Sequence, residues 1–104
     1  MKRAVHGYMR VHAATPDVEV RRDELRLRCW AEREGFELVR IWQEEREGGI
    51  AVLGGLIEEL RRSPAAAVVV PSLRHFGESP VLREHLAAHL VDRADVDIYE
   101  VRDE

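Results

Sequence analysis

Seven side chains that can carry charge, transfer protons or bind metal ions follow the first three apolar segments of the chain. They are Arg10, His12, Glu44, Glu45, Arg74, His75 and Glu78. Histidine and carboxylate side chains together can hold a divalent metal ion, and a histidine can also accept a phosphoryl group. Arginine side chains bind phosphate oxygens. These residue types fit chemistry on a phosphate ester, provided that the fold brings them together.

The spacing of apolar residues predicts four strands and three helices that would position these side chains. The strands are expected at residues 3–11, 36–43, 65–70 and 96–101. The helices are expected at residues 18–34, between the second and third strands up to residue 63, and at residues 80–92. The segments at residues 44–49 and 71–77, which follow the second and third strands, are expected to be loops.

Single residues indicate where the helices begin and end and which faces they bury. Thr15 or Asp17 can cap the first helix, Gly35 is expected to end it, and Ser79 with Pro80 begins the third. The first helix has two apolar stripes on opposite sides, formed by Val20, Leu27, Trp30 and Ala31 and by Val18, Leu25 and Cys29. Only one stripe can face the sheet, so the other stripe indicates a surface that a partner covers. The buried face of the third helix is expected to contain Leu82, Leu86 and Leu90.

The order βαβαβαβ predicts one α/β domain over residues 1–104, a three-layer α/β/α sandwich with a mostly parallel sheet and flavodoxin-like winding. The wholly apolar run at residues 65–70 is typical of a central parallel strand. In such sheets the working side chains gather at the carboxyl ends of the strands. Neither G-x-G-x-x-G nor a Walker A pattern occurs in the sequence, so nucleotide binding has no support.

The segment Tyr8-Met9-Arg10-Val11-His12 resembles the Tyr-x-Arg-Val-Ser signature of the serine recombinase (resolvase/invertase) catalytic domain. Residues 30–39 and 68–79 also resemble segments of that family, in the same order and with matching spacing. The resemblance covers nearly the whole chain. It implies the α/β fold of that catalytic domain and a vestigial site formed by Tyr8, Arg10, His12, Arg74, His75 and Glu78.

Members of this family cut DNA through a serine that attacks phosphorus, while several arginines neutralise the charge on the phosphate oxygens. By the resemblance, Arg10 keeps one of these arginine positions, and His12 stands where the nucleophilic serine belongs. Phosphoryl transfer depends on an aligned nucleophile and positioned cations, so the loss of the serine removes the group that forms the covalent link.

Further substitutions affect the charge of the implied site. The resemblance places His75 and Glu78 at two arginine positions, Arg74 at an aspartate position, and Leu53 at a further arginine position. A carboxylate within about 6 Å of a phosphodiester repels it, and losing one charge-stabilising donor lowers the rate by about 10²–10³. The resemblance therefore implies a domain that does not cut DNA by the family mechanism, and we expect no enzyme activity and no cofactor.

The histidines admit a second interpretation. No His-x-Glu or Cys-x-x-Cys spacing supports a metal at His12 and His75, so drift of two exposed loop positions explains them more simply. His85 and His89 lie one helical turn apart, a spacing that can bind zinc, although a place on a helix flank accounts for them as well. We therefore expect no bound metal ion. The candidate ligands that this expectation sets aside are His12, His75, His85 and His89. His6 is expected in a strand, Trp30 and Trp42 in the core, and Cys29 as an inert packed thiol.

Composition argues against an autonomous DNA-binding protein. The chain has 16 Lys+Arg against 20 Asp+Glu, a net charge of -4, whereas nucleic-acid binders are more often basic. The sequence has no apolar run of the roughly 20 residues needed to span a bilayer, and no signal peptide is apparent. A single cysteine fits a reducing cytoplasm. The chain ends three residues after Val101, so we expect no helix-turn-helix domain.

Three hypotheses of function follow. The first is a catalytically inactive serine-recombinase-like domain that acts as a regulatory or protein-interaction module and self-associates, as a dimer. The second is a DNA-associated accessory protein of a recombination or mobile-element system, with weak backbone contacts from Arg10, Arg21, Arg22, Arg26 and Arg74. The third is a repurposed enzyme that uses His12 and His75 on a phosphate ester.

Overall fold

The computed structural model describes residues 2–45, 49–77 and 79–101. Its elements are β1 (Arg3–Arg10), α1 (Asp17–Arg33), β2 (Phe36–Glu44), α2 (Ala51–Arg62), β3 (Ala67–Val70), the 3₁₀ helix η1 (Leu73–Phe76), α3 (Pro80–Ala94) and β4 (Asp97–Glu100). The order of strands and α-helices is the predicted one. The predicted loop at residues 71–77 contains η1, and β2 extends to Glu44, which was expected in a loop.

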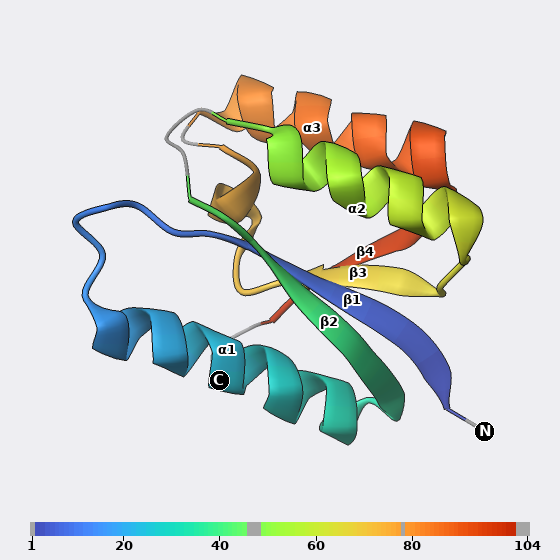
Figure 1. The fold of residues 1–104 in the computed structure, drawn as a ribbon, viewed down its shortest axis with the longest axis horizontal. Helices are drawn as coiled ribbons and strands as arrows, with labels where there is room; N and C mark the ends of the chain where they lie inside the picture. Colours follow the sequence, from blue (N-terminus) through green and yellow to red (C-terminus); the bar gives the residue numbers. More distant parts are fainter. Residues whose placement is uncertain (1, 46–48, 78, 102–104) are drawn as a thin grey trace.

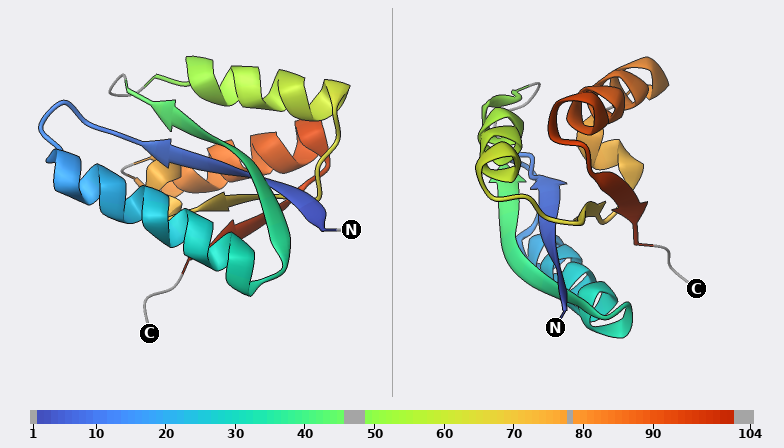
Figure 2. Two further views of the ribbon diagram at one scale, coloured as in Figure 1. Left: turned by 60° about the horizontal axis from the view of Figure 1, so that its bottom comes forward. Right: turned by 90° about the vertical axis from the view of Figure 1, so that its right-hand side faces the viewer.

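The four strands form one sheet of order β2-β1-β3-β4, in which every neighbouring pair is parallel. Helix α1 covers one face of the sheet, and α2 and α3 cover the other (Figures 1 and 2). The fold is therefore the three-layer α/β/α sandwich with flavodoxin-like winding that the sequence predicts. Because β1 and β3 lie side by side at the centre, their carboxyl ends open at the same edge of the sheet.

The sheet separates two apolar cores. On the side of α2 and α3, a cluster that includes Tyr8, Trp42 and Phe76 packs beneath the two helices. On the side of α1, the cluster includes Val5 and Trp30. Both tryptophans are buried, as expected for core residues. Residues of β3 are buried throughout, which is the burial expected of a central strand between two helical layers.

The helix ends follow the predicted turn chemistry except at the start of α1, and Gly35, with φ +78°, ends α1 as predicted. Pro16 is the N-cap residue of α1, and no described side chain caps it, so the prediction of Thr15 or Asp17 as the cap is wrong. Thr15 instead accepts a hydrogen bond from the backbone N–H of His12 at 3.2 Å, which leaves its hydroxyl turned back into the preceding loop. Ser79 caps α3 as predicted, accepting from the N–H of Leu82 at 3.1 Å.

Two predictions of burial are wrong. Cys29 is exposed rather than packed, because it lies on the outward face of α1 with Val18 and Leu25, which are 72% and 60% exposed. Leu82 is 41% exposed, because its side chain lies over the turn at Gly77 instead of under α3. The outward face of α1 therefore keeps its apolar residues accessible. None of the helices in the described residues is long and apolar enough to cross a bilayer.

Candidate functional site

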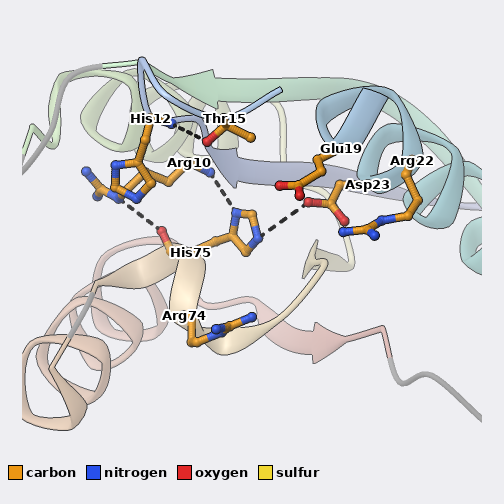
Figure 3. A pocket seen from close by; sticks show the side chains of 8 residues that line it. All are labelled: Arg10, His12, Thr15, Glu19, Arg22, Asp23, Arg74 and His75. Carbon is orange, nitrogen blue, oxygen red and sulfur yellow. Dashed lines mark hydrogen bonds and ion pairs between the residues drawn. The ribbon is translucent and has the colours of Figure 1, made fainter. Parts of the chain in front are cut away.

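A pocket of about 220 Å³ opens at the carboxyl end of β1, between the loop after β1, the first half of α1, and η1 (Figure 3). Its lining residues are Arg10, His12, Thr15, Glu19, Arg22, Asp23, Arg74 and His75. The pocket thus brings together four of the positions that the sequence predicts for the site. Of the other two predicted positions, Tyr8 is buried in the core and does not line the pocket, and Glu78 lies outside the described residues.

His75 is held in a defined orientation by the end of β1. Its Nδ1 accepts a hydrogen bond from the backbone N–H of Arg10 at 2.9 Å. An accepting Nδ1 carries no proton, so the neutral ring bears its proton on Nε2, which lies 3.9 Å from Oδ2 of Asp23. Burial lowers the pKa of His75, an effect that Asp23 opposes and nearby arginines strengthen. His75 is therefore a neutral, positioned ring rather than an exposed loop residue.

Arg10 is almost fully buried, with 8% of its surface exposed. Its guanidinium donates to the carbonyl of Gly49 at 2.8 Å, to the carbonyl of His75 at 3.2 Å, and to the hydroxyl of Tyr8 at 3.3 Å. These bonds join β1 to the segment before α2 and to η1. Arg10 therefore works as an internal link between three segments, and its contact with a DNA backbone stays a prediction.

Glu44 is a buried residue whose role the sequence did not reveal. It is 2% exposed, and its carboxylate accepts hydrogen bonds from the N–H groups of Val52 and Leu53 at 3.1 Å. The hydroxyl of Tyr8 also donates to Glu44 at 3.3 Å. Burial, as the largest cause, raises the pKa of Tyr8, so the phenol stays protonated. Glu44 thus stabilises the N-terminal end of α2 instead of lining the pocket.

His12 lines the pocket in a half-buried position. Its backbone N–H donates to the Thr15 hydroxyl at 3.2 Å, and its carbonyl accepts from the Thr15 N–H at 3.0 Å. This turn fixes the backbone on which the imidazole is carried. Both His12 and His75 are half-buried, and His75 lies in η1, whereas the drift interpretation takes them as exposed loop positions.

Two solved structures have the same fold over nearly the whole chain. The N-terminal catalytic domain of TP901-1 integrase matches with a TM-score of 0.77 and 18% identity, over 94% of this chain and 76% of that chain. The C-terminal catalytic domain of ISC1926 TnpA, an IS607-like serine recombinase, matches with a TM-score of 0.77 and 17% identity, over 97% of this chain and 69% of that chain. This chain has the fold of a serine recombinase catalytic domain. No protein-family model and no curated protein sequence matches it.

In this serine recombinase fold, α1 supplies Arg22, which the sequence predicted only as a DNA-backbone contact, and two pocket residues that were not predicted, Glu19 and Asp23. Glu19, Arg22 and Asp23 are spaced i, i+3 and i+4, so one flank of α1 turns all three toward the pocket. That spacing can be read from the sequence, but it does not stand out because α1 carries many other charged residues of both signs. The pocket therefore holds two carboxylates beside the arginines Arg22 and Arg74.

The remaining predicted positions of this recombinase-like domain lie apart from the pocket or in other contacts. Arg21 is exposed on α1, and Arg26 pairs with Asp23 at 3.2 Å. His85 and His89 lie on α3 and do not line the pocket. Within the described ranges, no group of three or more histidine, cysteine or acidic side chains could hold a metal ion.

Proposed function

We propose that this domain is a non-cutting member of the serine recombinase fold, which works in the cytoplasm as a self-associating protein-interaction module. The supporting observation is what fills the pocket at the end of β1. Imidazoles stand at the positions that the resemblance assigns to the nucleophile and to one catalytic arginine, namely His12 and His75. A phosphodiester in this pocket would meet neither an attacking serine nor the expected set of cations.

The charge balance of the pocket supports this proposal. Arg22 and Arg74 are accompanied by Glu19 and Asp23, so the cations that line the pocket are offset by carboxylates. The guanidinium of Arg10 already donates to internal oxygen atoms. Stabilising the charge of a phosphoryl-transfer transition state requires cations aimed at the phosphate oxygens, and each missing donor lowers the rate by about 10²–10³.

Self-association is assigned to the outer stripe of α1, which consists of Val18, Leu25 and Cys29. All three are exposed, and Val18 and Leu25 are 72% and 60% accessible. A second copy is the partner that the charges of α1 favour. The first turn of the helix carries the acidic residues Asp17 and Glu19, and the last turn carries the basic residue Arg33 beside Glu32. Two α1 helices packed antiparallel about a two-fold axis would bring Arg33 of each copy to the acidic end of the other.

Sedimentation velocity over a wide range of protein concentration tests this assignment. We expect the wild-type domain to form dimers as its concentration rises, and Leu25→Glu to remain monomeric. Val81→Glu is the matched control, because Val81 is a 78% exposed apolar residue on α3 and should leave the dimer intact. A wild-type domain that is monomeric at every concentration, or equal losses in both variants, would refute self-association through this stripe.

A second candidate function is weak binding to a DNA backbone, favoured by the place of Arg22 and Arg74 on opposite walls of one pocket. The proposed contacts are Arg10, Arg21, Arg22, Arg26 and Arg74. Fluorescence anisotropy with a DNA duplex at about 50 mM salt tests it, since backbone binding weakens steeply as salt rises. Binding that Arg22→Ala with Arg74→Ala abolishes, and Arg61→Ala on α2 leaves unchanged, would support it. No binding at this salt concentration would remove it.

A further inference from the structure

One side chain joins η1 to the central strand of the sheet. The ladder between β1 and β3 includes residues from Val5 to Gly7 of β1. Further along β1, the N–H of Arg10 donates to the imidazole Nδ1 of His75 at 2.9 Å. The acceptor at this position is therefore the His75 side chain and not a backbone carbonyl of a neighbouring strand. The carbonyl of His75 also accepts from Nε of Arg10 at 3.2 Å. Residue 75 is thus held to residue 10 through both its ring and its backbone.

The bond between Arg10 and His75 exists for only one protonation state of the ring. Nδ1 can accept from the Arg10 N–H while it keeps its lone pair. A proton added to Nδ1 would place two N–H donors face to face across the present 2.9 Å. A protonated ring must therefore leave the Arg10 N–H, which removes one of the two links between residue 75 in η1 and the end of β1. The other ring nitrogen already lies 3.9 Å from a carboxylate, Oδ2 of Asp23.

The charged groups around His75 determine which state is populated. Asp23 on α1 favours the protonated ring, but its carboxylate is also engaged by Arg26, 3.2 Å away. The protonated ring is disfavoured by three arginines, which are Arg10 on β1, Arg26 on α1 and Arg74 on η1. His12, Glu19 and Arg22 line the same pocket from the loop and α1. Burial is the largest effect and lowers the pKa of His75, so the neutral, bonded ring predominates at neutral pH.

We propose that His75 is a proton-sensitive latch, whose ring bonds to the end of β1 when neutral and leaves it when protonated, so that acidification loosens η1 and reshapes the pocket wall that carries His75. This conformational device is independent of self-association, because the outer stripe of α1 faces away from the sheet and does not line the pocket. It also requires no DNA contact. The latch would act below the ordinary titration range of histidine.

An NMR titration of the wild-type domain tests the latch without any variant. The ring nitrogens of His75 report its protonation, and hydrogen exchange reports the Arg10 N–H. As His75 takes up its proton, we expect the protection factor of the Arg10 amide to fall by about tenfold, equivalent to the loss of one ordinary hydrogen bond. Amide shifts of Leu73 and Phe76 in η1 should change over the same pH range.

Variants separate the latch from general acid unfolding. His75→Asn keeps an acceptor near the position of Nδ1 and does not titrate, so the Arg10 amide should stay protected at low pH. His12→Asn removes the other pocket histidine and should leave the wild-type transition unchanged. The proposal is wrong if the Arg10 amide keeps its protection through the titration of His75. It is equally wrong if His75→Asn shows the same loss of protection as the wild type.

Discussion

Oε1 of Glu44 accepts a hydrogen bond from the backbone N–H of Leu53 at 3.1 Å, so a residue at the end of β2 caps the beginning of α2. The carboxylate is 2% exposed and is also bonded to the hydroxyl of Tyr8. The N-cap residue of α2 itself, Ile50, has no side chain that could satisfy the first N–H groups. A carboxylate from outside the helix therefore supplies the missing acceptors.

Replacing Glu44 should destabilise the fold. We expect Glu44→Ala to lower the free energy of unfolding by about 2 kcal/mol, because it leaves buried N–H groups without acceptors. Glu44→Gln keeps an acceptor oxygen and should lose less. Urea unfolding measures both. Glu37→Gln, at an exposed position of the same strand, is the control and should change stability by less than about 0.5 kcal/mol. Equal stability of Glu44→Ala and wild type would contradict this role.

Two glycines should respond to alanine in opposite directions. At Gly77, φ is +156°, and an added Cβ would lie 2.6 Å from the Leu82 side chain, so Gly77→Ala should destabilise by about 1–3 kcal/mol. At Gly54 within α2, an added Cβ meets nothing within 4 Å. Gly54→Ala should stabilise by about 0.5–1 kcal/mol, since alanine is the better helix former. Thermal unfolding measures the change in stability of each variant. A change of the same sign in both variants would count against the described turn at Gly77.

Acid should weaken the fold partly through His6. Nδ1 of His6 accepts from the indole N–H of Trp42 at 3.0 Å, and burial lowers the His6 pKa from 6.5, helped by Arg40 and opposed by Glu59. The unfolded chain therefore takes up a proton more readily than the folded one. The stability that this bond contributes is complete above pH 6.5 and is lost as the pH falls through the lowered pKa of the folded state.

The pH dependence of unfolding measures that contribution. Between about pH 7.5 and about pH 5, we expect the wild-type domain to lose more stability than His6→Asn, which keeps an acceptor but does not titrate. Burial lowers the pKa of His75 as well, so acid also weakens the fold through His75. His6→Asn should therefore reduce the pH dependence of the unfolding free energy without abolishing it. Identical pH profiles for wild type and His6→Asn would show that His6 titrates alike in both states.

The exposed thiol of Cys29 reports on the outer stripe of α1. Because Cys29 is exposed, a thiol reagent should label it rapidly in the folded monomer. If two copies cover the stripe, labelling should slow as protein concentration rises. Leu25→Glu should remove this concentration dependence, while Val81→Glu on α3 should retain it. Labelling that is slow at every concentration would instead indicate the packed thiol that the sequence suggested.

The fold was readable from the sequence because its signals are local. The apolar run of β3 and the Ser79 cap depend on residues that are neighbours along the chain, and both are present as predicted. The links at Glu44 and His75 depend on partners from other elements, which spacing alone does not identify. For the same reason Cys29 was misjudged, because periodicity finds an apolar stripe without showing which stripe the sheet covers.

The proposed absence of strand cutting is tested most directly with supercoiled plasmid and purified protein, by scoring nicked DNA and a covalent protein–DNA adduct. We predict neither product from the wild-type domain, and neither from His12→Ser, because a restored hydroxyl at residue 12 would still lack the cations that the reaction requires. Thr15 is the one hydroxyl among the residues that line the pocket, so Thr15→Ala serves as the control for an unexpected nucleophile. An adduct formed by the wild-type protein alone would contradict the proposal.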